Sequence, residues 1–230
     1  MILPPGPGYS ESFLRQMFQP KVLSPNQLNI LTAIEFPPNL EIYLAGGTGL
    51  ALQIGHRTSV DFDFYGKRHF DANEVSKKLV SIFPSFDIEF VAKDTLRGKV
   101  RETEVSLFYY DYPLIFPLRN FRGIKIASVQ DIAAMKLAAI IQRGTKRDFI
   151  DIFYLLKTYT LKRLIGFALK KYKGYQEMLI LRALIYFEDA DKEKYPRAIK
   201  IIDPGFSWEK AKEKILDEVK KYQFLMIKGS

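Results

Sequence analysis

Two aspartates on one short, largely apolar segment are the residues best suited to do chemistry in this sequence. Asp61 and Asp63 alternate with apolar residues over positions 59–65, which is the period of two that is typical of a strand. Residues two apart on a strand point to the same side, and hard cations such as Mg²⁺ or Mn²⁺ prefer carboxylate oxygens. We therefore expect Asp61 and Asp63 to hold a divalent cation. The alternative is an edge strand whose carboxylates face water.

A glycine-rich turn, Gly46-Gly47-Thr48, lies between a predicted strand at 41–46 and a short predicted helix that ends at Gly55. The free N–H groups and the dipole of a helix N-terminus favour a phosphate, and glycines let the backbone approach it closely. Thr48 adds a hydroxyl donor. The pattern therefore indicates a phosphate site beside the cation, although the same residues could form a simple turn.

A second group of charged residues lies further along the chain, around the predicted start of a helix at about residue 146. Its cations are Lys136, Arg143, Lys146 and Arg147, and they are followed by Asp148 and Asp151. Asp148 and Asp151 are three residues apart and share one helix face. The alternative is purely structural: Asp148 caps the helix and Arg147 pairs with Asp151. Arg57, just before the aspartate strand, could bind a phosphate or pair with Asp61.

Taken together, these motifs resemble the AbiEii/AbiGii toxin family of the nucleotidyltransferase superfamily, which includes DNA polymerase beta. The resemblance spans roughly residues 20–165 and rests on two stretches in the right order, 44–63 and 132–151. It implies an α+β fold, with a nucleotidyltransferase-type mixed β-sheet flanked by helices and an all-helical C-terminal part. It also implies transfer of a nucleoside monophosphate from a nucleoside triphosphate to an acceptor, with release of pyrophosphate. In several such toxins the acceptor is the 3′ end of tRNA.

The resemblance also implies roles for individual residues. The catalytic set would be Asp61, Asp63, Lys136, Asp148 and Asp151, with Asp61 and Asp63 as the Mg²⁺ or Mn²⁺ ligands. The nucleotide-binding set would be Gly46, Gly47, Thr48, Arg57, Ser59, Lys136 and Arg143. The protein would be the toxin of a toxin–antitoxin or phage-defence system, with a cognate antitoxin as a further partner.

Polymerase-type nucleotidyltransferases usually carry a third carboxylate on a later strand, as the base toward the attacking hydroxyl. The candidate here is Glu104, which alternates with Val105 on a predicted strand over residues 99–110. The sequence does not fix which face of that strand meets the metal site. If Glu104 points away, Asp148 or Asp151 could supply the charge.

Composition narrows the remaining classes of protein. The chain has 230 residues, no cysteine and two histidines, which excludes disulfide scaffolds, zinc–thiolate sites and three-histidine zinc sites. Neither a membrane span nor a secretory signal is recognisable, so we expect a cytoplasmic protein that does not bind membranes. The net charge of +9 favours polyanionic partners such as RNA. A basic and aromatic cluster in the C-terminal part fits contact with RNA phosphates, and its members are Lys162, Arg163, Lys170, Lys171, Lys173, Tyr172 and Tyr175. The alternative is a solvated face of a small helical domain.

The predicted organisation is an N-terminal arm over residues 1–20, a nucleotidyltransferase core over 21–127 and a helical C-terminal domain over 128–230. Ser24-Pro25 and Ser128 begin helices, and residues 87–93 and 99–110 form two strands with a turn at Leu96-Arg97-Gly98. Two other functions fit the same sequence. One is a nucleotide-binding module without catalysis, and the other is a transferase that modifies a protein or a small molecule.

Overall fold

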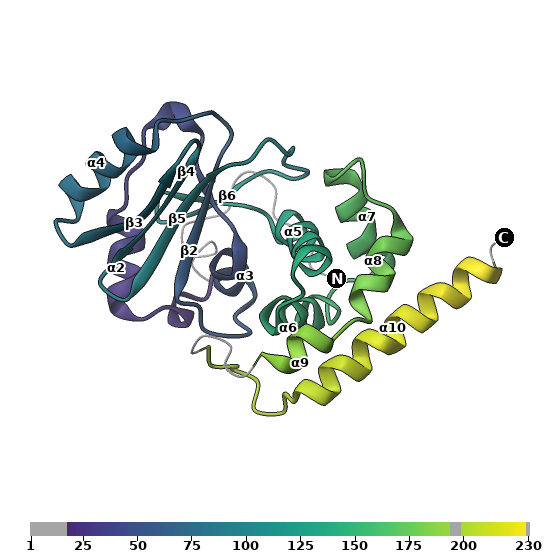
Figure 1. Ribbon diagram of the computed structural model, residues 1–230. Helices are drawn as coiled ribbons and strands as arrows, with labels where there is room; N and C mark the ends of the chain where they lie inside the picture. The colour runs from purple at the N-terminus through teal and green to yellow at the C-terminus, as the bar shows by residue number, and fades with distance from the viewer. Residues whose placement is uncertain (1–17, 194–198, 229–230) are drawn as a thin grey trace, which may run out of the picture.

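A mixed seven-stranded sheet with helices on both sides forms the N-terminal part of the molecule (Figure 1). This computed structural model describes residues 18–193 and 199–228. The strand order is β3-β4-β5-β2-β1-β7-β6. The pairs β2–β5 and β1–β7 are parallel, and the other neighbours are antiparallel. The fold is therefore of the α+β class, as the sequence predicts.

The strands are β1 (Tyr43–Leu44), β2 (Asp61–Gly66), β3 (Phe86–Ala92), β4 (Thr95–Val100), β5 (Thr103–Tyr109), β6 (Arg119–Phe121) and β7 (Ile124–Ile126). The helices among them are α2 (Pro25–Ala33), α3 (Gly46–Ile54) and α4 (Ala72–Ile82), with short 3-10 turns at Pro20–Val22 and Pro38–Leu40. Local signals explain the helix starts: Ser24 and Asp71 each accept a hydrogen bond from a backbone N–H in the first turn.

The sheet has one apolar face and one face that is largely polar. Phe62 and Phe64 of β2 point into a core shared with α2 and α4, together with Val105 and Leu107 of β5. The alternate residues of β2, beginning with Asp61, point to the other side, where the helical part lies. This alternation is what aims the carboxylates of β2 away from the core.

The sequence-based assignment of residues 87–110 is wrong in one respect. Leu96-Arg97-Gly98 is not a turn but the middle of β4, and the chain turns instead at Asp94 (φ +56°) and Arg101 (φ +55°). Gly98 pairs with Val105 of β5, and glycine is needed there because a Cβ would lie 2.5 Å from both the carbonyl oxygen of Asp87 and the ring of Phe86. The strand β6 was also not predicted.

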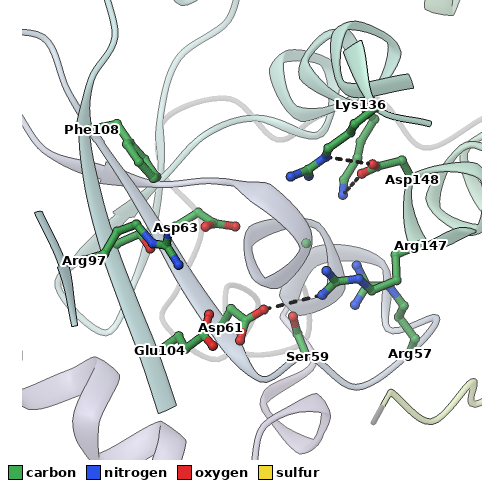
Figure 2. Close-up of a pocket in the computed structure, with 13 residues that line it drawn as sticks. Arg57, Ser59, Asp61, Asp63, Arg97, Glu104, Phe108, Lys136, Arg147 and Asp148 are labelled. Atoms are coloured by element: carbon green, nitrogen blue, oxygen red, sulfur yellow. Dashed lines mark hydrogen bonds and ion pairs between the residues drawn. The ribbon is translucent and has the colours of Figure 1, made fainter. Parts of the chain in front are cut away.

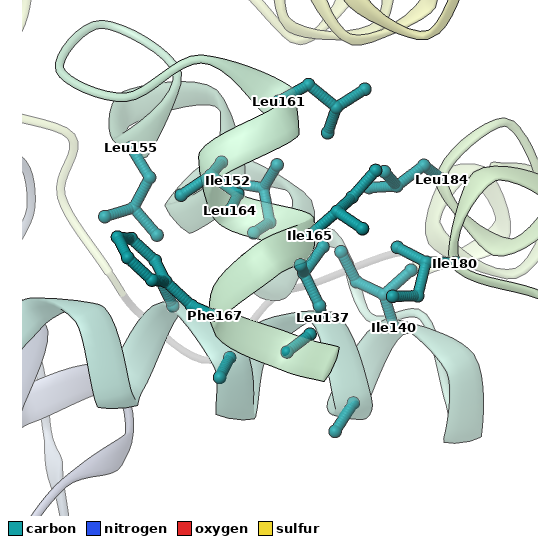
Figure 3. Packing of buried hydrophobic residues seen from close by; sticks show 14 of the residues in the cluster. Leu137, Ile140, Ile152, Leu155, Leu161, Leu164, Ile165, Phe167, Ile180 and Leu184 are labelled. Carbon is teal, nitrogen blue, oxygen red and sulfur yellow. The ribbon is translucent and has the colours of Figure 1, made fainter. Parts of the chain in front are cut away.

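After β7 the described chain is mostly helical. The helices are α5 (Val129–Gln142), α6 (Lys146–Leu155), α7 (Leu161–Lys171), α8 (Glu177–Leu184), α9 (Glu188–Lys192) and α10 (Trp208–Lys228). Leucine and isoleucine side chains of α5, α6, α7 and α8 interdigitate in a common core (Figure 3). That core extends to Tyr43 and Leu50 of the sheet part, so α5 is fixed against α3. The division at residue 127 and the arm over 1–20 stay predictions, and residues 1–17 of that arm lie outside the described residues.

Two long-range connections hold the loops around the sheet. Lys171 donates to Asp131 over 2.9 Å in a fully buried ion pair, and Asp131 also accepts from the backbone N–H groups of Ile115 and Phe116. Further along the chain, residues 200–202 run antiparallel to residues 56–58 and exchange backbone hydrogen bonds with them. The second connection fixes the loop that carries Arg57.

Candidate active site

A pocket of about 340 Å³ lies between the polar face of the sheet and helices α5 and α6 (Figure 2). Its lining residues are Gly47, Arg57, Ser59, Asp61, Asp63, Arg97, Glu104, Ser106, Phe108, Lys136, Arg143, Arg147 and Asp148. The strands contribute Asp61, Asp63, Arg97, Glu104, Ser106 and Phe108, whereas Ser59 comes from the loop before β2 and Asp148 from α6. The loop before β2 and helices α5 and α6 contribute most of the cations.

Three carboxylates gather on the strand side of the pocket. Asp61 and Asp63 share one face of β2, and the parallel register places Glu104 of β5 directly opposite Asp61. The question that the sequence left open is thereby answered, because Glu104 lies on the pocket side of the sheet. Burial and the neighbouring Asp61 raise the pKa of Asp63 above its ordinary value. Like charges at this spacing are a site that favours a cation.

The two glycines at the start of α3 make room for charged side chains. Gly46 has φ +58°, and a Cβ on it would lie 2.3 Å from Oδ2 of Asp63. A Cβ on Gly47 would lie 2.5 Å from Nη2 of Arg57. The helix begins at Gly46 with no side-chain cap, so its first N–H groups and its positive dipole end are left for an anion at the pocket. Gly47 lines the pocket and Gly46 does not.

Thr48 does not occupy the position expected of a triphosphate contact. Its side chain is 1% exposed, and its hydroxyl bonds to the carbonyl of Asp61 and to the Ser59 hydroxyl. Thr48 therefore supports the start of β2 from behind, while Ser59 reaches the pocket. The expectation of a free hydroxyl donor is wrong because the first turn of α3 directs this side chain into the protein.

A buried carboxylate organises the cations on the helix side. Asp151 accepts from Nε and Nη2 of Arg57 at 2.7 and 2.9 Å, and it lies 2.7 Å from both Nζ of Lys136 and Nε2 of His56. Burial alone would raise the pKa of Asp151, but Arg57, Lys136 and His56 hold it well below its ordinary value. Asp151 is 0% exposed and does not line the pocket. It fixes two cations that do.

Asp148 forms the second anchor for the same lysine. Its carboxylate lies 2.9 Å from Nζ of Lys136 and accepts from the hydroxyl of Thr145 at 2.7 Å. Burial would lower the pKa of Lys136, but Asp148 and Asp151 raise it, so the ammonium stays charged. Asp148 is not a helix cap, because α6 begins after Thr145. Arg143, at the end of α5, lies 3.4 Å from Asp148 and is otherwise exposed.

Arg147 joins the two sides of the pocket. Its Nη1 lies 3.4 Å from Oδ2 of Asp61, whereas its Nε is buried without a hydrogen-bond partner (Figure 2). The sequence-based alternative paired Arg147 with Asp151, and this is wrong because Arg57 and Lys136 already surround Asp151.

The structure brings most of the predicted residues into one place. Among them, Gly47, Arg57, Ser59, Asp61, Asp63, Glu104, Lys136, Arg143 and Asp148 line the pocket, whereas Gly46, Thr48 and Asp151 lie directly behind it. Sequence reasoning did not assign Arg97, Ser106 and Phe108 to the site. Ser106 and Phe108 share the face of Glu104 by the alternation of the predicted strand, so they depended on the same open question, whereas Arg97 would have been indicated only if β4 had been recognised as a strand.

Comparison with known proteins agrees with this geometry. A family model described as "Nucleotidyl transferase AbiEii toxin, Type IV TA system" matches residues 82–201, which is about half of the chain. The chain belongs to the AbiEii nucleotidyl transferase toxin family. It is thus a nucleotidyltransferase of the toxin–antitoxin class. The matched region includes Glu104, Lys136, Asp148 and Asp151, whereas Asp61 and Asp63 lie before it.

Other relatives extend the likeness over more of the AbiEii chain. An uncharacterised protein of Aquifex aeolicus (strain VF5) is 38% identical over 188 residues, covering 79% of this chain and 88% of that one. A crystal structure of a candidate nucleotidyltransferase from H. pylori superposes with a TM-score of 0.55 at 16% identity, covering 96% of this chain and 99% of that one. The crystal structure of JHP933 from Helicobacter pylori gives 0.54 at 17% identity, covering 96% of each chain. Both superpositions show the same fold.

Two negative findings apply to the described part of the AbiEii chain. Within residues 18–193 and 199–228, no group of three or more histidine, aspartate or glutamate side chains is arranged so that it could hold a metal ion. Over the same ranges no helix is both long and apolar enough to cross a bilayer.

Proposed function

We propose that this AbiEii protein transfers a nucleoside monophosphate from a nucleoside triphosphate to the 3′ end of an RNA, with tRNA as the first acceptor to test. The observation that carries the proposal is the division of the pocket. Three carboxylates on the strands lie opposite a group of cations, of which Arg57 and Lys136 are held in place by Asp151 and Asp148. Such a pocket complements a triphosphate whose α-phosphate lies against the carboxylates.

The residues present fit a divalent cation that binds together with its substrate. Mg²⁺ typically takes one or two carboxylates and completes its shell with waters and substrate phosphates. Asp61 and Asp63 supply those carboxylates, and burial and the neighbouring Asp61 raise the pKa of Asp63 despite the nearby cations of the pocket, which is the setting that a bound cation would relieve. Mg²⁺ or Mn²⁺ bound there would lower the pKa of the acceptor hydroxyl and stabilise the pyrophosphate.

The residues of the chain then have separate tasks. The acceptor oxygen forms a bond to the α-phosphorus as the bond to the bridging pyrophosphate oxygen breaks, and Glu104 takes the hydroxyl proton. Arg57, Lys136, Arg143 and the first N–H groups of α3 hold the triphosphate and the departing pyrophosphate. Asp148 and Asp151 are positioning residues, because each holds a cation in place and Asp151 does not reach the pocket.

The RNA acceptor is supported by charge, with a correction to the residues expected to contact it. Lys171 and Tyr172 are buried, the first against Asp131 and the second against Tyr110. The exposed members of the predicted group are Lys162, Arg163, Lys170 and Lys173. We further propose a cytoplasmic protein held in check by a cognate antitoxin, since nucleoside triphosphates and tRNA are found there and the family is of the toxin–antitoxin class.

The test is incorporation of nucleotide. The purified protein is incubated with Mg²⁺, total tRNA and each nucleoside triphosphate in turn, labelled at the α-phosphate. Asp61→Asn, Asp63→Asn and Glu104→Gln proteins run beside it, with Asp217→Asn on the exposed face of α10 as the matched control.

We expect label on RNA with the wild-type and Asp217→Asn proteins and none with the Asp61 and Asp63 variants. Glu104→Gln should retain nucleotide binding and lose transfer by about 100-fold or more. Label on protein or on a small molecule would replace RNA as the acceptor. Nucleotide binding without any transfer would leave a binding module and overturn the proposal.

A further inference from the structure

The polar face of the sheet continues beyond the pocket across β4 and β3. Asp63 pairs in register with Ser106, Ser106 with Arg97, and Arg97 with Phe90. These residues therefore form one row across four neighbouring strands. With strands about 4.8 Å apart, Arg97 lies roughly 10 Å and Phe90 roughly 14 Å from Asp63 along the row.

Phe90 is an exposed aromatic residue in a strand of which only Phe86 is buried. Its side chain is 49% exposed, and its neighbours Ile88 and Val91 are 44% and 36% exposed. The register of β3 shifts between Ile88 and Phe90, and such a bulge re-aims the side chain that it carries. Arg97, opposite Phe90, is exposed and also lines the pocket. An exposed aromatic ring beside an arginine is the combination that single-stranded nucleic acids use for stacking and phosphate contact.

The chemistry of transfer assigns this side of the pocket to the acceptor. In an in-line displacement the attacking oxygen and the departing pyrophosphate lie on opposite sides of the α-phosphorus. The cations that suit a pyrophosphate lie on the helix side, whereas Glu104 lies on the strand side, between Asp61 and the edge of the sheet (Figure 2). A hydroxyl that delivers its proton to Glu104 must therefore arrive over β5 and β4.

We propose that Arg97 and Phe90 form the acceptor subsite, which binds the single-stranded 3′ end of an RNA. This inference rests on the proposed function and names the surface that it requires. Arg97 binds a backbone phosphate near the terminal nucleotide, and Phe90 stacks under a base further from the end. Stacking of this kind tolerates any base, so the subsite selects a free strand rather than a sequence.

The test is direct binding of RNA, without any transfer step. The full chain is titrated into a fluorescently labelled single-stranded oligoribonucleotide of about ten nucleotides at several salt concentrations, and anisotropy gives the dissociation constant. The variants are Phe90→Ala, Phe90→Trp and Arg97→Ala. Val91→Ala is the matched control, because Val91 is the next residue of the same edge strand, points to its other face and is 36% exposed.

We expect Phe90→Ala to weaken binding by about five-fold or more with an unchanged salt slope, since stacking involves no ion release. Phe90→Trp should bind as well as the wild type. Arg97→Ala should lower the slope of log K against log salt by about 0.7, the value for one phosphate contact on a single strand. Val91→Ala should behave as wild type.

Other results would overturn the inference. Equal losses for Phe90→Ala and Val91→Ala would indicate a general disturbance of the edge strand rather than stacking of a base on Phe90, and would overturn the subsite. Loss of nucleotide binding in Arg97→Ala, measured as the thermal stabilisation by Mg²⁺ and a nucleoside triphosphate, would place Arg97 in the triphosphate site. No binding of RNA by the wild type would remove the subsite, whereas absence of the nucleotide-induced stabilisation would instead count against the proposed function.

Discussion

Replacing Asp151 by asparagine should weaken the protein and the nucleotide site together. The change removes the charge that balances Arg57 and Lys136, whose side chains are 2% and 8% exposed. Removing one partner of a buried ion pair destabilises a protein by about 3–5 kcal/mol. For a chain of this size each kcal/mol lowers the melting temperature by about 2–4 °C, so we expect a decrease of roughly 6–20 °C.

The structure offers a matched control for this loss of stability. Asp131 forms a comparably buried ion pair with Lys171, away from the pocket lining. Asp131→Asn should therefore lose a similar amount of stability and keep the cations of the pocket in place. Only Asp151→Asn should lose nucleotide affinity.

Thermal unfolding with and without Mg²⁺ and a nucleoside triphosphate separates the two effects. At a ligand concentration of about 100 times the dissociation constant, binding stabilises the folded state by about 2.7 kcal/mol, or roughly 5–10 °C. Asp131→Asn should show this whole increase. A 100-fold weaker site would gain only about 0.4 kcal/mol at the same concentration, which is what we expect of Asp151→Asn. A full ligand-induced increase in Asp151→Asn would refute the positioning role of this residue.

Three further results are expected. Gly47→Ala should lower transfer activity by about 100-fold, since its methyl group would displace Arg57, while Gly174→Ala, where a Cβ meets nothing within 4 Å, should be silent in the same assay. Asp63→Asn should abolish transfer and yet raise the melting temperature of the metal-free protein above about pH 4. The folded state raises the pKa of this carboxyl, so its ionised form destabilises the fold at those pH values, and an unchanged or lower melting temperature would contradict this. Burial lowers the pKa of His56, so its contribution to stability is complete above about pH 6.5 and declines as the pH falls. The free energy of unfolding of His56→Gln, measured in urea, should therefore depend less on pH between 7.5 and 5 than that of the wild type. Equal dependences would exclude His56 as the source of the pH effect.

Elements with a strong local signal could be predicted from the sequence. The Ser24-Pro25 start of α2 and the Ser128 start of α5 depend on side chains that bond within one turn. The alternation around Asp61 and Asp63 correctly places both carboxylates on one face of β2, because the period of a strand needs no tertiary information.

The rest depends on contacts between distant parts of the chain. The turns on either side of β4 place Asp94 and Arg101 at positive φ. Glycine is the residue usually expected at such a conformation, and this expectation led to the wrong turn at Gly98. The face on which Glu104 lies follows from its register with Asp61, 43 residues away. Asp151 could be recognised as a motif residue, but the bonds to His56 and Arg57 that make it a buried anchor span 95 and 94 residues, respectively.

The pairing of residues 200–202 with the Arg57 loop also affects the order in which the site can form during synthesis. Thr58 and its partner Lys200 are 142 residues apart, and a ribosome that adds 5–20 residues per second needs about 7–28 s to make the second after the first. The strand that carries Asp61 and Asp63 is thus synthesised well before the segment that completes the loop beside it. The acidic and cationic residues of the pocket, the last of which is Asp148, are therefore all made before residues 200–202, so the loop that carries Arg57 gains this support only after the rest of the pocket has been synthesised.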